Sequence, residues 1–216
     1  ANYIDSLVTL GGAYWDDMKS SASFVGVGIK GITVPLRDGM TVPTQNNFVA
    51  GDLDQLTGLK GDRATKYLDC GGDITTDYAQ NDHSFSVYRT VAGASGFEMC
   101  FGDNSVSTMI LVSRTSDMRY ADANSTLRIR GSAAAPTFIG VTRSSSSESS
   151  WRCGTNGTDA NVSSPLDGGF GNTLFARSDL ALPTDARLAT YHAGPALNLA
   201  TLEGLQDILI TEIAAI

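Results

Sequence analysis

The sequence has few of the side chains that build disulfide frameworks, metal centres or nucleophilic active sites. Its 216 residues include three cysteines, Cys70, Cys100 and Cys153, and two histidines, His83 and His192. The cysteines are odd in number, far apart and never spaced as Cys-x-x-Cys, which argues against a disulfide framework or a metal cluster. We expect all three to be small core residues, and both histidines to be structural or exposed.

Positive charge is also scarce. Lys and Arg number 15 against 23 Asp and Glu, which gives a net charge of −8, and the basic residues are scattered. Nucleic acids and anionic membranes are bound through basic faces that contact phosphate, so we expect neither as a partner. No apolar run approaches the roughly 20 residues of a transmembrane helix, and the first residues lack the basic and hydrophobic regions of a signal peptide. The start at Ala1 fits removal of an initiator methionine or proteolytic processing.

Catalytic motifs are absent as well. The sequence has no Gly-x-Ser-x-Gly nucleophile elbow, and its stretch Val25–Gly31 lacks the order and the following helix of a phosphate-binding glycine loop. Most acidic residues lie in turn sequences, where Asp bonds the local backbone, and no two stand out as the carboxylate pair of a glycosidase. The sequence therefore predicts a protein that is not an enzyme, with glycan hydrolysis as the least favoured alternative.

Short apolar runs separated by turns make up most of the chain. From Gly58 onward they recur every 10 to 15 residues or so, which is the rhythm of an antiparallel sandwich. In the run His83–Thr90, Ser84, Ser86 and Tyr88 alternate with Phe85, Val87 and Arg89, which predicts a strand with one wet face.

Two later segments have distinctive composition. Ser144–Ser150 is a polar, low-complexity stretch, which we expect to be a loop. Asn156-Gly157 is the best hairpin-turn signal in the chain and should join a strand at Trp151–Gly154 to a return strand.

The last residues have a different period. Apolar side chains recur every three or four positions, at Leu199, Leu202, Leu205, Leu209, Ile213 and Ile216. With Asn198 as N-cap, this pattern predicts an amphipathic helix over residues 199–216 that packs on the sandwich.

The first 46 residues carry large apolar side chains in a segment that is short for a core of its own. They include Tyr3, Tyr14, Trp15 and Phe24. We predict a helical and extended arm over residues 1–46, and we name these four aromatic residues as candidates for docking on a neighbouring subunit. The alternative is that they pack on the parent sandwich.

Two stretches carry a resemblance to a known family. Residues 58–69, GLKGDRATKYLD, resemble the opening of a concanavalin A-like (laminin-G-like) jelly-roll domain found in tailed-phage structural proteins. Residues 185–216 are similar to the end of the same family, where a strand with a "YxxG" turn leads into a short closing helix. In such openings glycine usually follows "GD"; here the residue is Arg63, so the turn must differ. The resemblance spans about residues 47–216 and implies a virion component.

These observations together predict a mainly β protein. It would have an antiparallel two-sheet jelly-roll sandwich over residues 47–198, the arm before it and the helix after it. The predicted function is a non-enzymatic structural component of a tailed-phage virion, synthesised in the host cytoplasm, as a capsid decoration (cement) or tail-associated protein. The lack of a heptad stalk favours decoration.

The same reasoning names partners and one alternative function. The partners would be other virion proteins and copies of the chain itself, with a trimer as the expected assembly. The alternative is a carbohydrate-binding receptor-recognition head of a tail fibre, with Trp151 or Tyr191 stacking on a host surface glycan. No cofactor is expected; calcium, which such sandwiches often hold near their loops, is the one ion that the Asp- and Asn-rich loops at 103–104 and 122–124 would suit.

Overall fold

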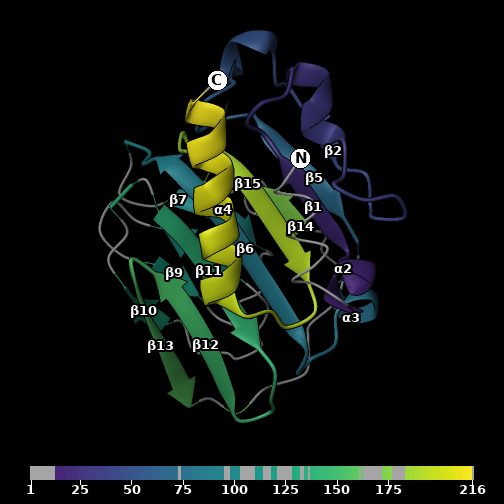
Figure 1. The fold of residues 1–216 in the computed structure, drawn as a ribbon, viewed down its shortest axis with the longest axis vertical. Coiled ribbons are helices and arrows are strands. Elements are labelled where there is room, and N and C mark those ends of the chain that lie inside the picture. Colours follow the sequence, from purple (N-terminus) through teal and green to yellow (C-terminus); the bar gives the residue numbers. More distant parts are fainter. Residues whose placement is uncertain are drawn as a thin grey trace.

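Two antiparallel β-sheets face each other, and one long helix lies on the outer face of the first (Figure 1). The computed structural model describes residues 13–72, 74–94, 98–102, 110–113, 118–120, 128–131, 134–135, 137–160, 162, 172–176 and 183–215. This arrangement confirms the prediction of a mainly β, two-sheet sandwich with a C-terminal helix.

The described elements are the following. Sheet A runs, in spatial order, β13 (Thr155–Ala160), β12 (Glu148–Cys153), β11 (Thr137–Arg143), β6 (His83–Val91), β15 (Arg187–Gly194), β4 (Gly58–Lys60) and β3 (Leu53–Asp54), with β1 (Ser20–Ser23) also paired to β15. Sheet B runs β10 (Arg128–Arg130), β9 (Met118–Tyr120), β8 (Ile110–Ser113), β7 (Glu98–Gly102), β14 (Asn172–Leu174), β5 (Tyr67–Gly71) and β2 (Thr44–Asn46). The helical elements are α2 (Ala13–Asp17), α3 (Ile74–Asp77), α4 (Leu199–Ala214) and the 3-10 turns η1 (Ile29–Thr33) and η2 (Ala50–Asp52).

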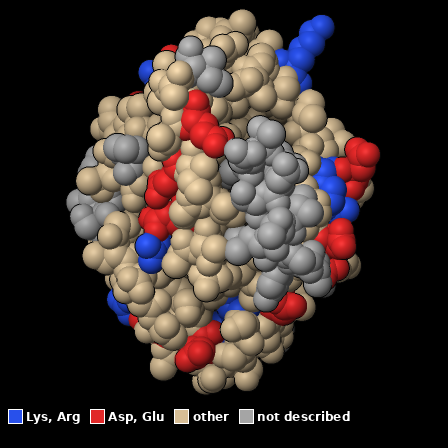
Figure 2. Space-filling view, in the orientation of Figure 1, with Lys and Arg blue, Asp and Glu red and all other residues tan. Residues whose placement is uncertain are grey.

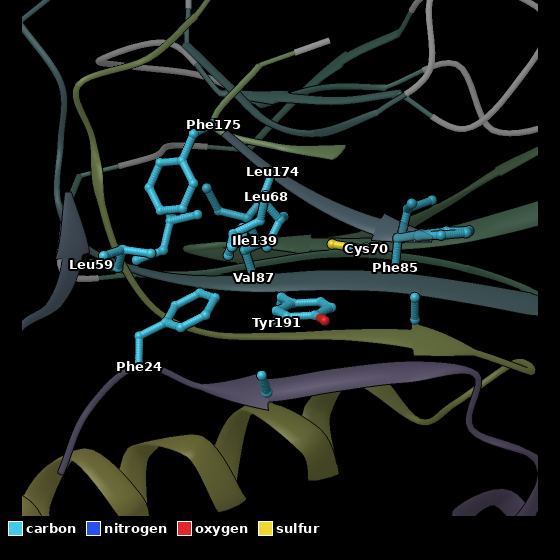
Figure 3. Packing of buried hydrophobic residues seen from close by; sticks show 14 of the residues in the cluster. Phe24, Leu59, Leu68, Cys70, Phe85, Val87, Ile139, Leu174, Phe175 and Tyr191 are labelled. Carbon is cyan, nitrogen blue, oxygen red and sulfur yellow. The ribbon is translucent and has the colours of Figure 1, made fainter. Parts of the chain in front are cut away.

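The main core lies between the two sheets. Strand alternation turns Phe85 and Val87 of β6 toward Leu68 and Cys70 of β5, and all four side chains are at most 1% exposed (Figure 3). Cys153 is buried in the same cluster, and neither it nor Cys70 forms a disulfide, as expected for small core residues; the side chain of Cys100 lies outside the described residues.

The outer face of sheet A is buried as well, and here the prediction of a wet face was wrong. Ser84, Ser86 and Tyr88 are only 1–7% exposed. The reason is that α4 and the segment before it cover this face: the Tyr88 hydroxyl donates to Asp207 Oδ1 of the helix at 2.9 Å, and Ser84 Oγ donates to the Pro195 carbonyl oxygen at 2.6 Å. A second apolar cluster, which includes Phe138 and Leu202, fills the layer between the helix and the sheet.

The segment expected as an arm is built into both sheets. Ser20–Ser23 pairs antiparallel with β15, and Thr44–Asn46 pairs with β5. In Figure 1 the purple strand β1 lies beside β15, so residues 13–46 extend the sandwich instead of projecting from it.

The turn that opens the family-like stretch is held by one carboxylate. Asp62 Oδ1 accepts hydrogen bonds from the backbone N–H groups of Ala64, Thr65 and Lys66 at 2.8–3.0 Å. Burial alone would raise the pKa of Asp62, but these hydrogen bonds outweigh it and lower the pKa to about 2. Arg63 inside this turn has a φ of 62°, in the left-handed region that favours glycine. The departure from the family pattern therefore falls at a position whose backbone suits glycine.

The hairpin of β12 and β13 exists, but its turn is not at Asn156-Gly157. Cys153 pairs with Thr155, so the chain reverses at Gly154, whose φ is 66°. Gly157 is a strand residue directly opposite Trp151, and an added Cβ would lie 2.7 Å from the indole Cζ2. Close packing under Trp151 explains this glycine. The polar stretch before it is only partly a loop, because β12 already begins at Glu148.

Candidate functional site

A groove of about 430 Å³ opens on the outer face of sheet A, beside the start of α4. Its walls come from β11, β12 and β13, three neighbouring strands at one edge of the sheet, and from the segment that leads into the helix. The lining residues are Thr142, Ser144, Ser150, Trp151, Arg152, Asn156, Gly157, Thr158 and residues 196–200.

The groove floor follows from strand register. Thr142, Ser150 and Thr158 stand directly opposite one another across β11, β12 and β13 and form one row. Arg152 and Asn156 stand opposite each other in the next row on the same face. Directly paired residues share a face of a sheet, so these side chains point together toward α4. Within the first row, the hydroxyl oxygens of Ser150 and Thr158 are 3.2 Å apart.

Two side chains fix the segment that closes the groove. Thr142 Oγ1 accepts the N–H of Leu197 at 3.1 Å and donates to the His83 carbonyl oxygen at 3.4 Å. Asn198 Oδ1 accepts the N–H groups of Ala200 and Thr201 at 3.1 and 3.2 Å, which confirms it as the N-cap of α4. Because the cap occupies the amide oxygen, the amide NH₂ of Asn198 is turned away from the helix end.

The one charged side chain of the groove lining has a partner on the helix. Arg152 Nε donates to Glu203 Oε2 of α4, and both side chains are largely buried. This pair joins α4 to β12 and balances the charge of the guanidinium. Figure 2 shows acidic side chains gathered in a line along α4, which carries Glu203, Asp207 and Glu212.

A second ionic cluster connects the two sheets. Arg130 of β10 donates from Nε and Nη2 to the carboxylate of Asp159 in β13, with Nη2 2.6 Å from Oδ1, and Tyr120 of β9 donates to the same carboxylate. Burial alone would raise the pKa of Asp159, but the hydrogen bonds from Arg130 and Tyr120 lower it below its ordinary value. This carboxylate is a structural bridge between the sheets.

The aromatic residues named as docking candidates fall into two groups. Trp15 is 8% exposed and Phe24 is fully buried, with its ring centroid 5.8 Å from that of Tyr191. These two side chains pack within the chain itself. Tyr3 and the side chain of Tyr14 lie outside the described residues, so their docking role stays a prediction.

Neither aromatic residue expected to stack on a sugar is placed to do so. Tyr191 is fully buried, with its hydroxyl 2.8 Å from Ser20 Oγ. Trp151 is opposite Val141 and its ring packs on the core cluster, on the other side of the sheet from Arg152.

Both histidines are buried structural residues. His83 Nδ1 is 2.8 Å from the Ala79 carbonyl oxygen, and His192 Nδ1 is 2.6 Å from Ser21 Oγ. Burial lowers the pKa of His192 to about 3. In the described part of the chain no three His, Cys, Asp or Glu side chains are grouped closely enough to hold a metal ion. The loops named for calcium, 103–104 and 122–124, lie outside that part. No described helix has the length and apolarity needed to cross a membrane.

One buried polar residue was missed at the level of sequence. Gln206 is fully buried on α4, and neither atom of its amide has a hydrogen-bond partner among the described residues. The leucine spacing drew attention to Leu205, which is only half-buried. The signal was available, because Gln206 stands four and seven residues after the buried Leu202 and Leu199.

Comparison with known proteins shows the fold. No protein-family model and no curated protein matches the chain. The crystal structure of the botulinum neurotoxin serotype D binding domain matches with a TM-score of 0.59 and 8% identity, over 90% of this chain and 52% of that one. The structure named HCR/D-Sa-GBL1/C matches with a TM-score of 0.60 and 9% identity, over 92% and 52%. The chain thus spans about half the length of these structures, and at such identities the likeness establishes a jelly-roll-like sandwich alone.

Proposed function

We propose that this chain is a non-enzymatic structural component of a tailed-phage virion. The observation that carries the proposal is that the two stretches resembling the phage family are neighbours in the fold. The first contains β4 and the second contains β15, and these strands pair through Leu59–Leu188 and Lys60–Arg187. Arg187 Nη1 also donates to the Gly58 carbonyl oxygen at 2.6 Å. The resemblance therefore describes one continuous structural unit, which two chance matches would not be expected to form.

A compact sandwich favours capsid decoration over a long fibre. We also propose that the chain assembles in several copies, as a trimer, and exposed apolar side chains support this assembly. Val34, Val42 and Val49 are 59–63% exposed on the segment before β3. A contact with another subunit or a virion protein would remove such side chains from water.

Quantitative mass spectrometry of purified particles tests this role. The expected result is that the chain is present in a fixed ratio to the major capsid protein, at many copies per particle. A few copies per particle would place it in the tail instead. Absence from purified particles of the phage that encodes it would refute the virion role.

A receptor-recognition head is the second candidate, and the polar groove favours it. A solved structure of the same fold is named a binding domain, which supports a binding role without indicating its ligand. The test is competition: purified chain added in excess should slow adsorption of the phage to its host. Unchanged adsorption would exclude the receptor-recognition head and leave only the structural role.

A further inference from the structure

We propose that the groove at the start of α4 is a binding site for an uncharged saccharide. This inference rests on the receptor-recognition candidate proposed above. It concerns the face formed by Ser144, Ser150, Arg152, Asn156, Thr158 and Asn198.

The first argument is the chemistry of the lining. Five of these six side chains are hydroxyls or amides, and such groups both donate and accept hydrogen bonds. Sugar hydroxyls do the same, so each can meet a complementary partner. In the described part of the chain, the side chains of Asn156 and Ser144 have no hydrogen-bond partner, and the capping geometry leaves the Asn198 amide NH₂ available.

The second argument is the charge. Arg152 is the only ionisable side chain among the lining residues, and Glu203 neutralises it through its Nε. The remaining guanidinium N–H groups can still donate to a neutral hydroxyl. Beyond Glu203, α4 carries Asp207 and Glu212 and no basic residue, so an anionic sugar beside the helix would meet a negative potential (Figure 2). This favours an uncharged ligand over a sialylated or uronate-containing one.

The third argument concerns affinity. The groove has no aromatic platform, because Trp151 faces the core, so a few hydrogen bonds must carry recognition. We therefore expect dissociation constants in the millimolar range, about −4 kcal/mol of binding free energy. On a particle with many copies, avidity multiplies such weak contacts into useful attachment.

The experiment is an NMR titration of the full ¹⁵N-labelled chain with glucose, galactose, mannose and N-acetylglucosamine at concentrations spanning the millimolar range. At least one sugar should cause saturable shifts confined to the amides of residues 142–158 and 196–200. Asn156→Ala and Ser150→Ala should each weaken binding about fivefold, as expected for one lost hydrogen bond. Asn46→Ala, in the edge strand β2 of the other sheet, is the matched control and should change nothing.

Three outcomes would overturn the proposal. One is the absence of saturable shifts with all four sugars, and another is shifts that map outside the groove. The third is a stronger response to galacturonate, or to an extended threonine-rich hexapeptide, than to any neutral sugar. Mass spectrometry of the particles distinguishes failure of the sugar-site proposal from failure of the virion proposal. If the protein is present on particles but binds no sugar, only the sugar site is wrong. If it binds sugar but is absent from particles, only the virion role is wrong.

Discussion

At the scale of single residues, Arg63 is one of the described non-glycine residues with a left-handed backbone, at a φ of 62°. A non-glycine residue in the left-handed region costs about 1–2 kcal/mol, and glycine removes that cost while adding some entropy to the unfolded chain. The ion pair of Arg63 with Asp185 spans 3.9 Å and the Arg63 side chain is 46% exposed, so the pair contributes little. Arg63→Gly should therefore raise the unfolding free energy by about 0.5–1 kcal/mol in urea denaturation.

Arg63→Ala is the control for this variant. It removes the ion pair but keeps a residue with a Cβ atom in the left-handed conformation. It should leave stability within about 0.5 kcal/mol of the parent. Destabilisation by both variants would show that the ion pair, and not the backbone, matters at this turn.

Gln206 presents the opposite case, a polar side chain buried without hydrogen-bond partners. An unsatisfied buried amide costs about 1–3 kcal/mol, and leucine has a similar size. Gln206→Leu should raise the melting temperature, whereas Gln206→Ala should lower it by leaving a cavity. A lower melting temperature for Gln206→Leu would mean that the amide is hydrogen-bonded in solution.

At the scale of the element, α4 is anchored along one face by apolar packing, the Arg152–Glu203 ion pair and the Tyr88–Asp207 hydrogen bond. Leu202 is 2% exposed on that face, and Ile208 is 47% exposed. Leu202→Asp should destabilise by several kcal/mol because it buries an unpaired charge, and the matched variant Ile208→Asp should be close to neutral. Thermal unfolding followed by circular dichroism measures both. Equal losses would mean that the helix packs with another face, or that Ile208 is covered by a partner.

At the scale of the whole molecule, acid should unfold the protein through its buried neutral histidine. The pKa of His192 is about 3 in the folded state, against 6.5 for an unperturbed imidazole, so below pH 6.5 the unfolded chain binds one more proton. Stability is then fully present above pH 6.5 and falls as the pH drops towards 3, by up to about 1.4 kcal/mol per pH unit. The ¹H chemical shift of the His192 ring should stay constant down to pH 4. A titration midpoint near 6.5 would contradict its burial.

The parts of this fold that the sequence predicted are those fixed locally. Alternation marked the core strand His83–Val91, and Asn198 with the leucine spacing marked α4, because strand period, caps and helical stripes depend on near neighbours in the chain.

The parts that sequence reasoning missed depend on distant contacts. The outer face of β6 was expected to be wet, but it is covered by residues more than 100 positions later: Ser84 Oγ donates to the Pro195 carbonyl oxygen, and the Tyr88 hydroxyl donates to Asp207 of α4. Gly157 was predicted to lie in a turn because the sequence does not reveal that the Trp151 indole packs against its backbone. The groove combines polar residues from three strands and a helix start, which strand register and the hydrogen bond from Leu197 to Thr142 bring together.

The most direct test of the virion role is immunogold electron microscopy of intact particles with antibodies raised against the purified chain. We expect gold at regular positions over the capsid, with labelling lost after pre-incubation of the antibody with the chain. Label restricted to the tail would assign the chain to the tail-associated class. Particles without label, from a phage whose infected cells contain the protein in quantity, would contradict the proposal that it is a structural component of the virion.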